Sequence, residues 1–205
     1  MAIATMEEVQ SALEPHHPRI RKVIDDAWGE WRAVQAFRQQ ADYGALAYTR
    51  TISNYMFDAI ARRATRAFAA VDHVHIRAEA QTVKFFFGGT VLVRFKKGDD
   101  AKLGCNIPTE AALAFIDAER QVPGLPPETA KVEIIWQPNE IWTQVDRVLV
   151  VARDGDRLIW EYEIGLEEEG AQLLEFPRGP RPEDDDQPLV KPKPITKPGS
   201  TTHKD

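Results

Sequence analysis

Between residues 74 and 96, basic side chains alternate with apolar ones, and these basic side chains are the best candidates for binding or catalysis. Alternation with a period of two residues predicts β-strands with one buried face. The apolar residues stay on one face if the first hairpin turns at Ala80-Gln81 and the second through the three-residue loop Gly88-Gly89-Thr90. In that register one basic row crosses three strands, namely Arg77, Lys84 and Arg94, flanked by His75 and Lys96.

This basic row needs an explanation, because like charges directly opposite each other destabilise a sheet. Carboxylates from another element could offset the charges, and so could a bound anion such as phosphate. A third interpretation is a solvated face on which the long side chains splay apart. His75 is the candidate for general acid or base chemistry, because it is the histidine near the row. The row predicts an anion-binding surface at Arg77, Lys84, Arg94 and Lys96 and leaves the catalytic residue unknown.

A second polar pattern lies on a predicted helix over residues 45–70, opposite its apolar stripe. Its members recur every four residues and so share one helix face. Asp58 and Arg62 would then form an ordinary ion pair worth about 0.3–0.5 kcal/mol. The strip could bind RNA phosphates or place a carboxylate near a scissile bond, and the alternative is a solvated helix face. The strip consists of Arg50, Asn54, Asp58, Arg62 and Arg66.

Other chemistry-bearing residues lack the partners that their chemistry requires. His16 and His17 are adjacent and do not face one site, whereas His73 and His75 share a strand face but lack further ligands. Cys105 has no identifiable base, so a partly buried structural thiol is expected. No Walker, Rossmann, HEXXH or G-x-S-x-G motif occurs, and neither a metal nor a cofactor is predicted. The remaining aromatic candidates are expected in the core: Trp136, Trp142 and Trp160.

The elements that must position these residues follow from the hydrophobic periodicity. The pattern changes from helical to alternating at about residue 73. We predict an α+β fold, with N-terminal helices packed on a mainly antiparallel sheet of about six strands and one helix crossing between two three-stranded halves. Helices are expected at 1–14, 19–40, 45–70 and 109–119. Strands are expected at about 74–78, 83–87, 91–96, 132–136, 145–152 and 158–164.

Some details of these helices are also predicted. His16-His17-Pro18 is expected to break the chain, because proline disfavours a helical residue before it. The apolar stripe of the helix over 19–40 is expected to include Phe37. The crossing helix is expected to begin after Thr109 as its N-cap and to make apolar contacts through Leu113, Phe115 and Ile116.

The 205 residues fit a single domain over 1–176, helical over 1–70 and sheet-rich over 71–166. Residues 177–205 hold seven prolines and runs of charge, which predicts a disordered tail. The net charge is −6, but residues 50–102 hold ten Lys and Arg against five Asp and Glu. This distribution excludes general nucleic-acid coating and leaves room for one local anion site.

Composition also indicates the compartment. The N-terminus has neither the basic nor the apolar region of a secretory signal, and no apolar stretch approaches the length of a membrane span. Cys105 is the only cysteine, which excludes an internal disulfide framework. We therefore expect a cytoplasmic protein without a membrane partner.

Several runs between Met56 and Ile164 are distinctive: MFDAIARRA, TVKFFFGGTVLVRFKKGD, NIPTEAALAFID, PGLPP and RVLVVARDGDRLIWEYEI. This segment resembles an uncharacterised family of bacterial and prophage proteins found in two-gene modules. The resemblance implies a cognate protein partner from a neighbouring gene, a helix-turn-helix protein of the ImmA/IrrE type. It further implies one component of a toxin–antitoxin or phage-defence pair, with the toxic role as one candidate and RNA or a nucleotide as a candidate target. The alternative is an accessory interaction protein without chemistry of its own.

Overall fold

The computed structural model describes residues 4–79 and 82–165. The predicted tail over 177–205 lies outside these residues. The helices in the described part are α1 (Met6–Leu13), a 3₁₀ turn (Glu14–His16), α2 (His17–Gln40), α3 (Thr49–Phe68) and α4 (Glu110–Ile116). The strands are β1 (Val74–Glu79), β2 (Thr82–Phe87), β3 (Val91–Lys97), β4 (Ala130–Pro138), β5 (Val145–Asp154) and β6 (Arg157–Glu163).

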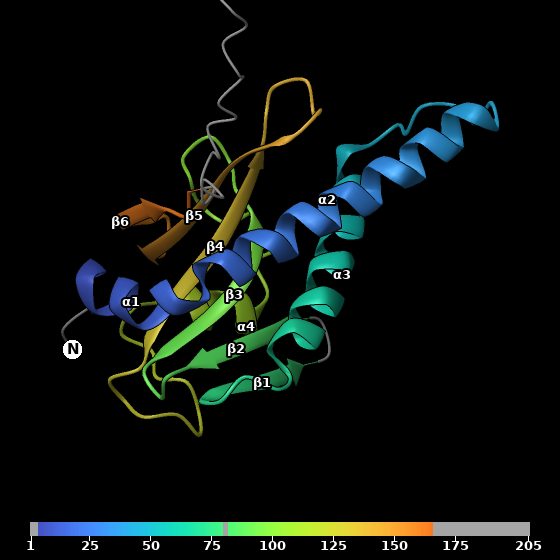
Figure 1. Cartoon of the computed structure of the whole chain (residues 1–205). Helices are drawn as coiled ribbons and strands as arrows, with labels where there is room; N and C mark the ends of the chain where they lie inside the picture. The colour runs from blue at the N-terminus through green and yellow to red at the C-terminus, as the bar shows by residue number, and fades with distance from the viewer. Residues whose placement is uncertain (1–3, 80–81, 166–205) are drawn as a thin grey trace, which may run out of the picture. The chain divides into compact units, whose positions relative to one another are not determined.

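The described strands form one six-stranded sheet in the order β1-β2-β3-β4-β5-β6 (Figure 1). All neighbouring strands are antiparallel except β3 and β4, which run parallel. A parallel pair needs a crossover connection, and α4 lies in that crossover. The predicted α+β architecture, with one helix crossing between two three-stranded halves, is therefore confirmed.

The predicted hairpin register is also confirmed. Phe85 pairs with Val93, and Lys84 pairs with both Arg77 and Arg94 on its two sides. The loop between β2 and β3 has three residues, and Gly88 and Gly89 adopt φ values of 56° and 72°. Glycine enters this left-handed region without steric cost, so the glycines permit the loop length that keeps apolar residues on one face.

Helices α1, α2 and α3 cover one face of the sheet, which we call the helix face. Phe85, Val93 and Trp136 are fully or almost fully buried on this face. α2 lies over β5, and α3 lies over β1 and β3. The helices contribute the buried residues Val9, Leu13, Ile20, Val23, Ile24, Ala27, Trp28, Trp31, Met56, Ala59, Ile60, Ala64 and Phe68.

The opposite face of the sheet, which we call the α4 face, carries charges between two small apolar clusters. One cluster joins Phe86 and Leu92 to Phe115 and Ile116 of α4. The other cluster consists of Leu103, Ile135, Leu149 and Val151.

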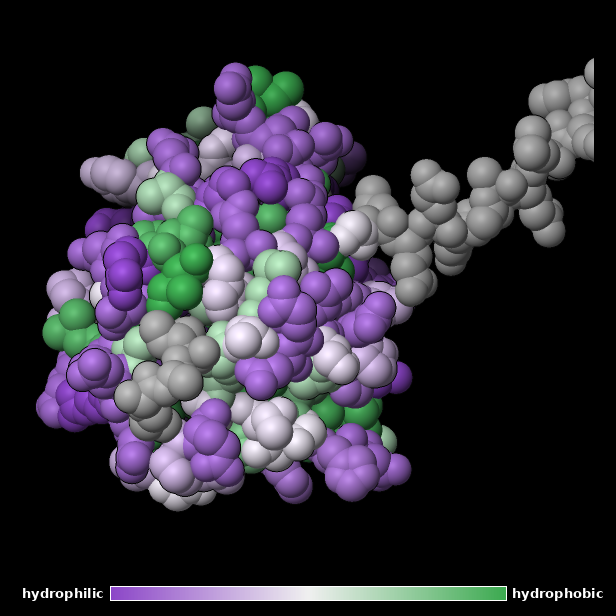
Figure 2. Space-filling model, turned by 90° about the vertical axis from the view of Figure 1, so that its left-hand side faces the viewer, coloured by the Kyte–Doolittle hydropathy of each residue, from purple (hydrophilic) through white to green (hydrophobic). Residues whose placement is uncertain are grey.

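On the side of the molecule seen in Figure 2, hydrophilic side chains cover most of the surface. No helix in the described part of the chain combines the length and apolar character needed to cross a bilayer.

The expected break between two helices occurs, but it lies at Glu14–His16, and the role expected for Pro18 is wrong. The 3₁₀ turn Glu14–His16 leads directly into α2, which begins at His17. Pro18 occupies the first turn of α2, where its missing N–H removes no intrahelical hydrogen bond. The proline therefore starts the helix instead of interrupting the chain.

Two residues expected in the core lie at the surface. Phe37 is 62% exposed, because the end of α2 extends past the sheet (Figure 1). Leu113 is 49% exposed, because the short helix α4 presents Phe115 and Ile116 to the sheet. Thr109 caps α4 as predicted, since its hydroxyl accepts a hydrogen bond from the Ala112 N–H at 3.2 Å.

Glu30 joins α2 to α3. Its carboxylate accepts hydrogen bonds from Arg62 at 2.6 Å, Arg63 at 2.8 Å and the Tyr55 hydroxyl at 2.9 Å. The pair predicted between Arg62 and Asp58 is therefore wrong, because Arg62 reaches across to the neighbouring helix. The hydrogen bond from Arg62, helped by those from Tyr55 and Arg63, lowers the pKa of Glu30 from 4.5 to about 2.

This depressed pKa predicts an acid-sensitive helix pair. A carboxyl with a lowered folded-state pKa stabilises the protein above its unfolded pKa, and this contribution is lost as pH falls through about 4.5 towards 2. We expect Glu30→Gln to remove part of the fall in unfolding free energy between about pH 5 and pH 2 in urea titrations. Glu110→Gln, at an exposed site, is the control. Identical pH profiles for Glu30→Gln and the wild type would contradict the prediction.

Candidate functional site

Two members of the basic row predicted from the sequence, Lys84 and Arg94, lie beneath α4 rather than on a solvated face. Lys84 is 7% exposed and Arg94 is 3% exposed. The ring of Phe115 on α4 covers both, with its centroid 4.1 Å from the Arg94 guanidinium carbon and 5.7 Å from the Lys84 Nζ. The two charges are thus held in a covered environment, where unpaired charge is unfavourable.

Carboxylates from other strands offset this charge. Glu133 of β4 stands opposite Arg94 in the parallel pair, and its Oε1 lies 2.5 Å from Arg94 Nη2. The other oxygen of Glu133 contacts Arg153 Nη1 at 3.3 Å. Lys84 Nζ contacts Glu79 Oε1 of β1 at 2.8 Å. The sequence leaves three explanations for the basic row open. Of these, pairing with carboxylates is the one that the structure shows at both Lys84 and Arg94.

Glu133 is the centre of a buried ion cluster that we define as Arg94, Glu133 and Arg153. Glu133 is 1% exposed. Burial opposes its ionisation, yet Arg94 and then Arg153 hold the pKa of its carboxyl below the usual value. A buried carboxylate with this many cationic partners remains charged at neutral pH.

The ion cluster also holds the chain segment that follows β3. The Gly104 N–H donates to Glu133 Oε2 at 3.1 Å, and the Asn106 side-chain amide donates to Glu133 Oε1 at 3.3 Å. A Cβ on residue 104 would lie 2.4 Å from Glu133 Oε2, so this close approach requires glycine. Glu133 therefore fixes the backbone between Leu103 and Asn106.

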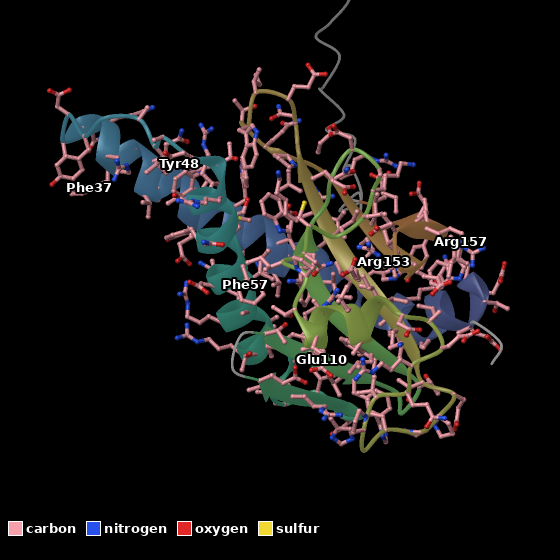
Figure 3. All side chains as sticks on the ribbon, turned by 180° about the vertical axis from the view of Figure 1, so that it is seen from behind. Phe37, Tyr48, Phe57, Glu110, Arg153 and Arg157 are labelled. Carbon is pink, nitrogen blue, oxygen red and sulfur yellow. The ribbon has the colours of Figure 1, made fainter. Side chains whose placement is uncertain are left out.

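Beside this segment, α3 passes the ends of the first strands and leaves a groove. Its deeper hollow has a volume of about 690 Å³. A second hollow of about 500 Å³ shares Asn54, Phe57 and Lys96 with it. We call the two together the α3 groove, and Figure 3 shows Phe57 on α3 near α4. The deeper hollow is lined by Thr49, Arg50, Ser53, Asn54, Phe57, Ile60, Phe95, Lys96, Lys97, Cys105, Asn106, Ile107 and Trp136.

Cations without carboxylate partners distinguish the deeper hollow. Its lining, within the described ranges, contains Arg50, Lys96 and Lys97 and neither aspartate nor glutamate. Within residues 4–79 and 82–165 these three cations form no ion pair, and each instead lies over an aromatic ring, at 4.9, 5.7 and 4.8 Å respectively. Burial and then the charge of Arg94 lower the pKa of Lys96. The hollow is therefore a local positive site in an acidic protein.

The groove unites part of each predicted polar pattern. Lys84, Arg94 and Lys96 of the row line it, together with Arg50 and Asn54 of the helix strip. The remaining strip residues, Asp58, Arg62 and Arg66, line a neighbouring hollow on the other side of Phe57.

Two predicted residues lie away from the groove. Arg77 donates to the Pro123 carbonyl at 3.2 Å, and His75 is exposed on β1; neither lines the groove. His73 lies outside β1 with a φ of 60°, so it does not share a strand face with His75 as expected. None of the histidines in the described residues therefore lines the groove.

The other candidates give no separate site. Cys105, expected to be partly buried, is exposed. Trp136 lies in the core as predicted, whereas Trp142 and Trp160 are half-buried at its edge. Among the residues that the structure describes, no cluster of three His, Cys, Asp or Glu side chains could hold a metal ion.

Sequence reasoning missed Glu133, Arg153 and Lys97. Glu133 is the one carboxylate in the apolar run Val132–Trp136, and this exception to the pattern was the available signal. Lys97 follows Lys96, so the two point to opposite faces of β3, and both reach the groove because they end the strand.

Comparison with family models, curated proteins and solved structures finds no match to this chain. The class that the structure defines is an α+β domain with a cationic groove between α3 and the sheet.

Proposed function

We propose that this protein binds a phosphate-bearing anion in the α3 groove. The observation that carries the proposal is that Arg50, Lys96 and Lys97 surround one hollow to which the described part of the chain contributes no carboxylate. A volume of about 690 Å³ lies within the range of small-molecule sites. Phosphate oxygens accept charge-assisted hydrogen bonds, which are stronger than neutral ones.

The residues around these three cations favour binding of an anion over hydration of the cations by bulk water. Phe57, Phe95 and Trp136 form apolar parts of the lining. Electrostatic attraction is stronger in such a place than in bulk water. Arg94 and Lys84 are already paired with carboxylates, so the charge available to a ligand belongs to Arg50, Lys96 and Lys97.

A binding titration tests this proposal. We expect inorganic triphosphate and ATP to bind the full chain, with affinity that falls as salt rises. Lys96→Gln should weaken binding roughly tenfold or more, because it removes a hydrogen bond to a charged group. Calorimetry measures the affinity, and Arg66→Gln, on the same helix strip but outside the groove, is the matched control. Equal affinities for Lys96→Gln, Lys97→Gln and the wild type would contradict the proposal.

The cellular role we propose is that of one component of a cytoplasmic toxin–antitoxin or phage-defence pair. Its support is the resemblance of residues 56–164 to proteins of two-gene modules. Expressing the gene alone and with its neighbour, and scoring growth, tests this role. Inhibition of growth that the neighbour relieves favours the toxic role. Binding of the neighbour's product without any growth effect favours the accessory role.

A further inference from the structure

The end of α2 and its connection to α3 expose three aromatic rings. Phe37, Tyr43 and Tyr48 are 62%, 57% and 63% exposed. Figure 3 shows Phe37 at the end of α2 that extends away from the sheet, and Tyr48 near the start of α3. We call these rings, with Arg38 and Arg50, the aromatic tip.

The fold does not explain these rings. Tyr48 is the N-cap residue of α3, yet its side chain makes no capping hydrogen bond. Phe37 contacts Tyr43 edge-on, with centroids 6.3 Å apart, and both remain more than half exposed. Large exposed apolar side chains gathered in one place indicate a binding surface.

Guanidinium groups alternate with the rings. The Arg38 guanidinium lies 5.7 Å from the Tyr43 centroid, and that of Arg50 lies 4.9 Å from the Tyr48 centroid. Between Phe37 and Arg50 the sequence contains one carboxylate, Asp42. The tip is therefore aromatic and slightly basic, in contrast to the net charge of −6 of the whole chain.

Arg50 connects the aromatic tip to the α3 groove, because it stacks on Tyr48 and also lines the deeper hollow. A surface of rings and unpaired cations thus continues from the tip to Lys96 and Lys97. Single-stranded nucleic acids are recognised by this combination, in which bases stack on aromatic rings and cations meet the backbone phosphates. A protein partner would favour a continuous apolar patch, whereas here a guanidinium group lies over one face of Tyr43 and of Tyr48, and both rings stay more than half exposed.

We infer that the aromatic tip and the α3 groove together bind a single-stranded nucleic acid, for which single-stranded RNA is the probe. Bases stack on Tyr43 and Tyr48, and backbone phosphates meet Arg50, Lys96 and Lys97. This inference rests on the proposed anion-binding function and names its ligand class.

Fluorescence anisotropy with a labelled single-stranded RNA of about twelve nucleotides tests the inference on the full chain. Tyr48→Leu should weaken RNA binding roughly five- to a hundredfold, because leucine offers no flat ring for stacking. Tyr48→Phe should bind RNA like the wild type. Tyr48→Phe should leave the affinity for inorganic triphosphate unchanged, and Tyr48→Leu should weaken triphosphate binding less than RNA binding, because Arg50 loses the ring it stacks on but keeps its charge. Ile141→Ala, at an exposed apolar site outside the tip, is the matched control, and circular dichroism confirms folding.

The outcomes separate this inference from the proposed function. If Tyr48→Leu binds RNA as tightly as the wild type, or a duplex binds as tightly as the single strand, the inference is wrong. If triphosphate binds in a Lys96-dependent manner but RNA does not bind, the anion site stands and the nucleic-acid assignment fails. If Lys96→Gln changes neither affinity, both proposals fail. Tip variants that bind RNA normally but lose the neighbouring gene product would assign the tip to a protein partner and overturn the inference.

Discussion

Glu133→Ala should lower the free energy of unfolding by about 3–5 kcal/mol, because it leaves the buried Arg94 guanidinium without its carboxylate and leaves Arg153, among the described residues, with the exposed Asp156 alone. Arg94 is 3% exposed and Arg153 is 8% exposed, so water cannot replace the lost partner. The change also removes the acceptor of the Gly104 N–H. Urea denaturation at neutral pH measures the loss.

Glu163→Ala is the matched control for this experiment. Glu163 pairs with Arg147, but the two side chains are 44% and 35% exposed. An exposed pair contributes about 0–1 kcal/mol, so the control should lose little stability. A loss below about 1 kcal/mol for Glu133→Ala would show that the ion cluster is solvated and would contradict the buried arrangement.

Glu133 also has an indirect effect on the groove. It holds Gly104 and Asn106, and Asn106 lines both hollows of the groove. Loss of this anchor should therefore weaken anion binding as well as stability. Glu133 is a positioning residue in this account, because it does not line the groove itself.

Phe85→Ala should lower the free energy of unfolding by about 3–5 kcal/mol, the usual range for a fully buried phenylalanine. Phe85 is 0% exposed and stands opposite Val93 in the sheet. Its ring centroid lies 5.7 Å from that of Phe68 on α3 and 5.6 Å from that of Phe95 on β3. Truncation would leave a cavity at the junction of α3 and the sheet, and thermal or urea unfolding measures the loss.

Lys84→Ala is the comparison for Phe85, because Lys84 is its neighbour on the opposite face. The alternation alone predicts a loss well below 1 kcal/mol, on the assumption that Lys84 is exposed. The structure raises the expected loss to about 1–2 kcal/mol, since Lys84 is covered by Phe115 and paired with Glu79. Equal losses from Phe85→Ala and Lys84→Ala would contradict the assignment of Phe85 to the main core.

The sequence by itself determined the strands, the hairpin register and the helix that crosses between the sheet halves. These features are local. The alternation along a strand indicates which residues are buried. A three-residue loop with glycines at positive φ is then consistent with one register, in which Phe85 pairs with Val93. The sequence also determined that Lys84 and Arg94 would be adjacent, and hence that their charges needed an offset.

The tertiary structure alone decided which groups provide that offset and where the groove lies. Glu133 meets Arg94 because β4 pairs in parallel with β3 after a long crossover, and no local pattern sets that register. Glu30 forms an ion pair with Arg62 because α2 packs against α3, although Asp58 lies four residues before Arg62 within α3 itself. Arg50, Lys96 and Lys97 come together because the position of α3 along the strand ends depends on how its apolar face packs on the core. Alternation and helical periodicity specify which face of an element is buried, whereas the packing of whole elements decides which exposed residues become neighbours.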